Sequence, residues 1–295
     1  MVRTANSVGI DHRDGGRWTS LKLAGREWLW SGPGLHSGPR VGMTSYVDVG
    51  GLDECFPTVR GVPDHGVLWS HEWSEGWDDR RDTLWDDSSD DRWDELWETV
   101  ETDEFVFGRR MISGARRPPY ELNALWADYR LVAEPGYRFV WAAHALLDCA
   151  VGAQVVVPGG TSCRLFPEAS KVLDRPWPAG ALWVEDAWPR PGGIDLGTYA
   201  ETDGSAVGAV LVDCPVASVT DQGTTLRFEL ECPGQPVSTA LWRNLGGFPA
   251  DQPYRSLGVE PMLGRVFDLA EAGPGDAAVV PAAGVLSWRL TVSAS

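Results

Sequence analysis

A single histidine interrupts an otherwise apolar stretch, residues 139–147. In a β-strand, His144 would share one face with Val140, Ala142 and Leu146. A core histidine that is hydrogen-bonded to backbone groups is one interpretation, because buried ring nitrogens need partners. The other is a general acid, since a histidine pKa near neutrality allows proton donation at working pH.

A lone carboxylate poses the same question near the C-terminus. Glu260 lies in the mostly apolar run of residues 256–264. Burial of an unpaired carboxylate is costly, so the group must be neutralised, hydrogen-bonded or turned toward a cavity. A desolvated glutamate with a raised pKa can serve as a general base. A structural salt bridge with Arg243 or Arg255 is the competing interpretation.

A third candidate lies in a turn. The sequence Val-Pro-Asp-His-Gly at residues 62–66 is typical of a tight turn, which would hold His65 at the rim of a site. Loops of this kind often carry binding residues.

The elements that must position these groups are strands. Period-two alternation in residues 226–230 and 288–292 indicates half-buried strands, and β-branched runs at 155–157 and 207–212 indicate two more. The chain has 34 Gly and 21 Pro, many of which separate such runs. The pattern predicts an all-β fold, a large antiparallel β-sandwich.

One connection has the pattern of a hairpin. Residues 129–132 and 137–147 alternate like strands, and Pro135 and Gly136 lie in the short turn between them. We therefore predict that these two strands pair directly.

Composition bounds the domain organisation and the compartment. A chain of 295 residues with 43% hydrophobic residues can bury one large core, and no linker separates two compositionally distinct halves. We expect residues 1–295 to form one domain. No apolar stretch of about 18 residues occurs, and the first residues lack the apolar core of a secretory signal, which predicts a cytoplasmic protein without a membrane span.

Charge and cysteine content restrict the partners. The net charge of −17 opposes binding to nucleic acid or to anionic membranes. The five cysteines are far apart and form no CxxC pair, so neither a disulfide framework nor a metal site is predicted. The sequence leaves the oligomeric state open.

An acidic, Trp-rich insertion occupies residues 72–104, which contain 15 acidic residues and only three arginines. Trp73 and Trp77, like Trp93 and Trp97, are four residues apart, which fits short amphipathic helices as well as strands and loops. The segment could be an acidic lid over a cationic or polyhydroxyl ligand, but a solvated surface insertion is the favoured interpretation.

Four short motifs together resemble the aldose 1-epimerase (galactose mutarotase) superfamily, in particular its uncharacterised and hexose-phosphate epimerase-like branch. They are GGLDECFP at residues 50–57, PDHG at 63–66, WAAH at 141–144 and VEP at 259–261. Their order and spacing carry the resemblance. It implies a large antiparallel β-sandwich of the galactose mutarotase type, in agreement with the strand pattern.

The resemblance also implies roles for individual residues. Glu260 matches the family's general base, His144 its general acid, and His65 the histidine that contacts the sugar. Glu260 would take a proton from the anomeric hydroxyl O1 while His144, acting from the opposite side, would protonate the ring oxygen O5. The open-chain aldehyde then recloses as the other anomer. This reaction needs no metal or organic cofactor.

The sequence departs from the family pattern at one position. Many relatives carry an arginine immediately before the Gly-Gly pair, whereas this chain has Val49 there. Arg60 is the candidate substitute, and Asp53 and Asp64 are the other candidate substrate contacts. Asp53 and Glu54 would place carboxylates near the pocket, which disfavours a phosphorylated sugar. The expected substrate is a free, non-phosphorylated monosaccharide, either neutral or carrying an amino group.

Two other functions remain open, because one fold can host several activities. The chain could be a non-catalytic carbohydrate-binding protein, in which some of its 16 Trp stack on sugar faces. It could instead be another glycan-processing enzyme, such as a lyase, for which Tyr120, Tyr129 and Tyr254 are available as bases.

Overall fold

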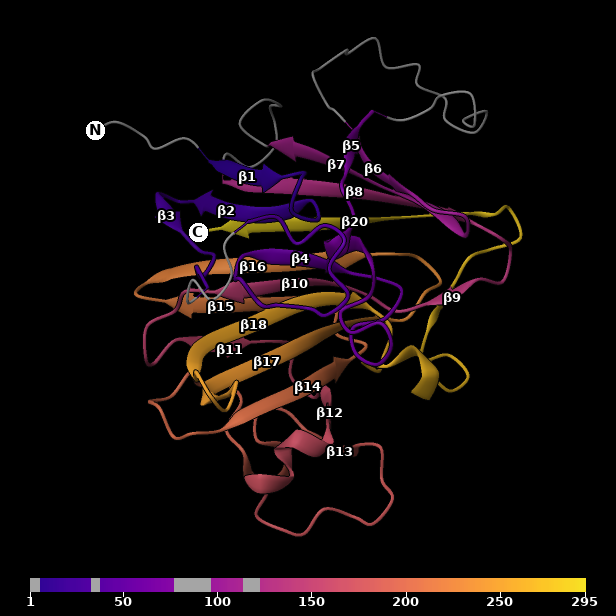
Figure 1. The fold of residues 1–295 in the computed structure, drawn as a ribbon. Helices are drawn as coiled ribbons and strands as arrows, with labels where there is room; N and C mark the ends of the chain where they lie inside the picture. The colour runs from indigo at the N-terminus through magenta and orange to yellow at the C-terminus, as the bar shows by residue number, and fades with distance from the viewer. Residues whose placement is uncertain (1–5, 33–37, 77–96, 114–122) are drawn as a thin grey trace.

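The computed structural model describes residues 6–32, 38–76, 97–113 and 123–295 of the chain. Strands dominate these residues, and the figure shows them arranged in two large sheets (Figure 1). The helical segments named here are short 3-10 turns: η1 (Leu68–Ser70), η4 (Pro167–Lys171), η5 (Pro191–Gly193) and η6 (Leu269–Glu271).

The larger sheet has ten strands in the order β1-β2-β4-β10-β18-β17-β14-β12-β13, with β3 paired to β2. All of these pairs are antiparallel. The bounds are β1 (Ser7–Asp11), β2 (Arg17–Leu23), β3 (Arg26–Glu27), β4 (Leu52–Cys55), β10 (Trp141–Leu147), β12 (Ser162–Leu165), β13 (Val184–Ala187), β14 (Ala206–Val212), β17 (Val237–Phe248) and β18 (Tyr254–Leu263).

The second sheet has eight antiparallel strands in the order β11-β15-β16-β20-β8-β7-β6-β5. Its strands are β5 (Ser74–Glu75), β6 (Trp97–Glu101), β7 (Phe105–Ser113), β8 (Ala124–Ala133), β11 (Gln154–Val156), β15 (Val216–Asp221), β16 (Thr224–Glu231) and β20 (Val285–Ala294). A separate two-stranded sheet joins β9 (Arg138–Phe139) to β19 (Ala278–Val279).

One hydrophobic core fills the space between the two large sheets. The larger sheet contributes residues such as Ala143 and Val259, and the second sheet contributes residues such as Phe107 and Leu290. In β20 the buried and less buried residues alternate, as expected where one strand face packs on a core. The predicted all-β, antiparallel sandwich is therefore confirmed.

A buried ionic group lies inside this core. Arg109 of β7 is fully buried and donates to Glu54 Oε1 at 2.7 Å and to Glu98 Oε2 at 3.0 Å. The Tyr129 hydroxyl and the Trp141 indole N–H also donate to Glu54, at 3.0 Å and 2.9 Å. Glu54 thus points into the sandwich, so the expectation that it lies with Asp53 beside the pocket is wrong.

Three of the four predicted strand runs fall within β14, β16 and β20, and the fourth, residues 155–157, overlaps β11 but extends one residue beyond its end. The predicted hairpin is wrong, because β8 and β10 belong to different sheets. The turn itself is present, with the Tyr137 N–H donating to the Glu134 carbonyl at 3.0 Å. The chain uses this turn to cross from one sheet to the other, and β9 pairs with β19 on the way.

The structure describes only the two ends of the acidic, Trp-rich insertion. Trp73 is buried in the core, and β5 pairs with β6 across the ends of the segment. Residues 77–96, which include Trp77 and Trp93 and most of the stretch for which helices, strands and loops were left open, lie outside the described residues.

Candidate active site

The outward face of the larger sheet carries a row of three ionisable side chains. His144 of β10 pairs with Asp53 of β4 on one side. On the other side, the flanking pairs Ala142↔Met262 and Leu146↔Gly258 place His144 opposite Glu260 of β18. Ala142 and Met262 belong to a small apolar cluster that is distinct from the main core. The strand register alone thus brings the two predicted catalytic residues together.

His144 and Glu260 contact each other directly. His144 Nδ1 lies 2.9 Å from Glu260 Oε1, and their side chains are 8% and 3% exposed. The ring N–H is not aligned with the oxygen, so the contact is an ion pair rather than a well-formed hydrogen bond. Within the described residues neither atom has another hydrogen-bond partner. These two atoms are buried against each other, which leaves His144 Nε2 and Glu260 Oε2 as the polar atoms of the pair that a ligand could contact.

The surroundings determine the protonation of His144. Burial disfavours the charged ring, but the negative charge of Glu260, followed by Asp48 and Asp53, outweighs burial and raises the pKa of His144 to about 9. The imidazole is thus protonated at neutral pH. This is the state that a general acid requires.

Asp53 is held by the protein itself. Arg40, which is fully buried, donates to Asp53 Oδ2 at 2.8 Å and to Oδ1 at 2.7 Å, and the Tyr46 hydroxyl donates to Oδ2 at 3.0 Å. Arg40 also donates to Asp14 at 2.9 Å. Both oxygens of Asp53 thus already accept hydrogen bonds from the protein, and its charge helps to raise the pKa of His144. Its contact with sugar stays a prediction.

The turn residue His65 lies beside His144 and its partner Glu260. Its ring centroid is 5.1 Å from that of His144, and it stacks on Tyr46 at 3.7 Å. The Trp69 indole N–H donates to the Gly66 carbonyl at 2.9 Å, which fixes the loop around His65. His65 adopts a φ of 58°, a left-handed conformation that is uncommon for a residue with a side chain.

Asp64 precedes His65 at the exposed edge of the site. Its Oδ1 lies 3.1 Å from His65 Nδ1, and the side chain is 55% exposed. Partial burial opposes ionisation, but the contact with His65 outweighs it and holds the pKa of Asp64 below its usual value. Asp64 therefore stays ionised beside the His65 ring, and its contact with sugar stays a prediction.

Arg60 lies on the far side of the same face. It donates to Glu168 Oε1 at 2.7 Å, and a Cβ on Gly208 would fall 2.6 Å from Arg60 Nη2. Gly208 pairs with Trp242, which pairs in turn with Gly258 of β18. Two inter-strand spacings of β-sheet separate β14 from β18, or about 10 Å. Arg60 and the pair of His144 and Glu260 thus lie on either side of a stretch of the sheet face that contains two glycines.

A glycine, Gly258, leaves room for the carboxylate of Glu260. A Cβ on Gly258 would lie 2.5 Å from Glu260 Oε1 and 2.9 Å from Trp242 Cβ. Both distances are shorter than normal contacts, so any side chain at this position would displace the carboxylate or the indole.

Sequence reasoning missed the residues that hold the site together: Arg40, Tyr46, Asp48, Glu168 and Trp242. No local pattern marks them, because the packing of loops, strands and the 3-10 turn η4, which carries Glu168, brings them to the site. The alternative partners proposed for Glu260 are wrong. Arg243 donates to the Asp195 carbonyl at 2.6 Å and Arg255 to the Ala200 carbonyl at 2.7 Å.

Two of the three tyrosines proposed as lyase bases already donate hydrogen bonds to carboxylates. Tyr129 is buried in the core and donates to Glu54, and the Tyr254 hydroxyl donates to Asp48. Burial, followed by Asp48, raises the pKa of Tyr254 well above its usual value. Tyr120 lies outside the described residues.

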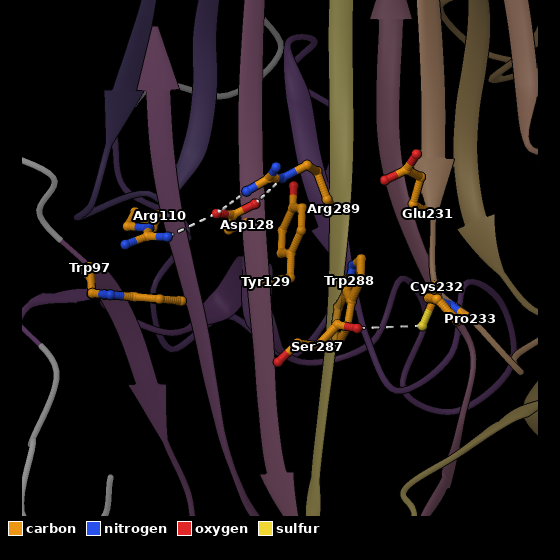
Figure 2. Close-up of a pocket in the computed structure, with 10 residues that line it drawn as sticks. All are labelled: Trp97, Arg110, Asp128, Tyr129, Glu231, Cys232, Pro233, Ser287, Trp288 and Arg289. Carbon is orange, nitrogen blue, oxygen red and sulfur yellow. Dashed lines mark hydrogen bonds and ion pairs between the residues drawn. The ribbon is translucent and has the colours of Figure 1, made fainter. Parts of the chain in front are cut away.

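Two cavities lie elsewhere. One of about 660 Å³ opens on the second sheet, where Figure 2 shows Asp128 between Arg110 and Arg289. Asp128 Oδ2 accepts from Arg110 at 3.0 Å and from Arg289 at 2.8 Å, so its charge is satisfied by the sheet. The other, of about 360 Å³, borders Asp14 and Arg17. Neither cavity includes the His144 and Glu260 pair.

Comparison with known proteins identifies the fold. No protein-family profile matches the sequence, and no curated protein matches it. Solved structures do match it, and three examples have TM-scores of 0.60 to 0.64. The Slr1438 protein of Synechocystis sp. PCC 6803 is 14% identical (98% of this chain, 91% of that chain, TM-score 0.64). A proposed aldose 1-epimerase of Escherichia coli K12 is 12% identical; the match covers 99% of this chain and 96% of that chain, with a TM-score of 0.61. A galactose mutarotase-like protein of Lactobacillus casei ATCC 334 is 14% identical; the match covers 99% of this chain and 98% of that chain, with a TM-score of 0.60.

These likenesses span nearly the whole of each chain. The chain therefore has the galactose mutarotase-like fold, and the fold expected from the sequence motifs is confirmed. Within the described ranges no helix is long and apolar enough to cross a membrane, and no group of His, Cys, Asp and Glu side chains is arranged to hold a metal ion.

Proposed function

We propose that the protein is an aldose 1-epimerase-like isomerase that interconverts the anomers of a free sugar. The observation that carries the proposal is the ion pair of a protonated His144 with Glu260 on the outward face of this fold. The names of two solved relatives, a proposed aldose 1-epimerase and a galactose mutarotase-like protein, support the same reaction class.

The geometry suits a proton exchange around one carbon atom. The carboxylate of Glu260 accepts the proton of O1 while the imidazolium of His144 donates to O5, and the C1–O5 bond breaks to give the aldehyde. Rotation about C1–C2 and reversal of the two transfers yield the other anomer. O1 and O5 are both bonded to C1, so an acid and a base that touch each other can serve both. The expectation that they act from opposite sides is replaced by adjacent placement.

The remaining site residues would bind the sugar or position the residues that bind it. His65 and Arg60 have donors within the same face and would contact sugar hydroxyls, and Asp64 orients His65. Arg60 is already paired with Glu168, so it offers a phosphate group little unbalanced positive charge. The proposed substrate is therefore a non-phosphorylated monosaccharide unit.

The experiment that tests the proposal is NMR magnetisation exchange between anomers of neutral, amino and phosphorylated aldoses. We expect acceleration with at least one non-phosphorylated aldose, and its loss in Glu260→Gln. Sugar binding without any acceleration would instead support the second candidate, a carbohydrate-binding protein that lacks the chemistry.

A further inference from the structure

Four aromatic side chains lie at one end of the proposed site and belong to neither hydrophobic cluster. They form what we call the aromatic wall: Trp30, Trp242, Phe248 and Tyr254. Trp30 stacks on Tyr254 with ring centroids 4.6 Å apart, and Trp242 meets the ring of Phe248 edge-on at 5.9 Å. Three of them are half-buried, and Phe248 is 49% exposed. Core packing therefore does not account for these rings.

The aromatic wall begins at the catalytic pair. Trp242 Cβ and Glu260 Oε1 both lie within 3 Å of the position that a Cβ on Gly258 would take. Trp242 also lies close enough to the Tyr254 hydroxyl to lower its pKa slightly, and that hydroxyl donates to Asp48. Asp48 is one of the charges that raise the pKa of His144. The wall is thus continuous with the site through contacts between side chains.

The aromatic wall is longer than one sugar ring. Glu260 and Tyr254 lie on the same face of β18 and are six residues apart, which corresponds to about 20 Å of extended strand. Phe248 pairs with Tyr254 at that distal end. A single pyranose whose C1 and O5 contact the catalytic pair would leave the distal part of the wall uncovered.

We propose that the aromatic wall binds the non-reducing ring of a neutral reducing disaccharide, while the reducing ring occupies the His144 and Glu260 site. Flat aromatic faces suit the C–H face of a pyranose, and the Tyr254 hydroxyl and Asp48 supply polar partners at its edge. This inference rests on the proposed function and specifies its substrate class.

The test compares anomer exchange of glucose with that of maltose and lactose, which are neutral disaccharides with a reducing glucose ring. We expect the wild-type protein to show a lower KM for at least one disaccharide than for glucose. Phe248→Ala should raise the disaccharide KM roughly tenfold, because about 1.4 kcal/mol of ring contact is lost, and leave glucose kinetics within twofold. Leu182→Ala, which removes a 47% exposed side chain outside the wall, is the matched control.

The outcomes separate the two proposals. If glucose exchange is catalysed but neither disaccharide has a lower KM, or if Phe248→Ala affects glucose and disaccharide equally, the aromatic wall is no second-ring site although the isomerase proposal stands. If no exchange occurs, calorimetric titration of the same sugars decides. Tighter disaccharide binding that Phe248→Ala weakens would support the wall, and equal or absent binding would overturn it.

Discussion

The ring of Tyr46 lies flat against the ring of His65, with centroids 3.7 Å apart and planes inclined by 9°. The hydroxyl of the same tyrosine donates to Asp53 at 3.0 Å. Tyr46 thus links the turn that presents His65 to the strand that supports His144. The two halves of the proposed site, one on a loop and one on the sheet, are held in register by this one side chain.

Two substitutions of Tyr46 separate its stacking from its hydrogen bond. Tyr46→Phe keeps the ring and should lower the free energy of unfolding by about 1 kcal/mol, with KM within twofold. Tyr46→Ala also removes the stacking, so we expect a clear rise in KM. Denaturant unfolding and exchange kinetics measure both effects. Equal KM values for the two variants would show that the stacking does not position His65.

The pKa of about 9 for His144 predicts a loss of activity at alkaline pH. The general acid is protonated below that pKa, so the rate should hold through neutrality and fall as the pH rises through about 9. Stability should follow the same direction. The pKa of His144 in the folded state is raised above the usual value of 6.5. The stabilisation that the protonated His144 contributes is therefore complete below pH 6.5 and is lost as the pH rises through about 9.

A pH series of exchange rates and melting temperatures measures both effects, with His144→Asn as the control. The variant should lack the alkaline loss of stability that His144 causes. A wild-type rate that is unchanged through pH 9 would argue against His144 as the acid.

Glu260→Gln tests the base and the ion pair together. The amide cannot accept the O1 proton, so turnover should fall by about 10² to 10⁴-fold while the fold is retained. The pKa of His144 should also fall, because its nearest negative charge is gone. NMR titration of the His144 ring measures that shift, and circular dichroism checks the fold. A variant with wild-type turnover would remove Glu260 from the mechanism.

Gly258→Ala tests the space reserved for the base. The new methyl group would lie 2.5 Å from Glu260 Oε1 and 2.9 Å from Trp242 Cβ, so one of the two side chains must move. We expect kcat to fall at least tenfold, because small displacements of catalytic groups are costly. Gly159→Ala is the control, since a Cβ there meets nothing within 4 Å and the backbone φ is ordinary. Equal kinetics in the two variants would contradict the argument.

Arg109→Met tests the ionic group inside the sandwich. Removal of the guanidinium leaves the buried Glu54 without a cationic partner and leaves Glu98 with His12 alone, which should cost about 3 to 5 kcal/mol of stability. Denaturant unfolding measures the loss. At a temperature where the variant remains folded, its exchange kinetics should be close to wild type, because the group faces away from His144. A variant of wild-type stability would show that the group contributes little.

The sequence by itself determined the strand class and the two residues at the centre of the proposed mechanism. Alternating apolar residues indicate strands because one face of each packs on a core, and that signal is local. His144 and Glu260 stood out because each interrupts an apolar run, and a buried polar group must find a partner. The sequence could not show that each is the other's partner.

Only the tertiary structure decided those partnerships. The turn at Pro135 and Gly136 has the same local geometry whether the chain pairs with itself or crosses to another sheet, so the hairpin was predicted and the crossing was not. Asp53 and Glu54 face opposite sides of β4, and the packing of the sheets decided which of the two faces the core. Arg40 and Tyr46 reach Asp53 through loop packing, and Glu260 reaches His144 through strand register. Such contacts join distant parts of the chain, and no local pattern of residues encodes them.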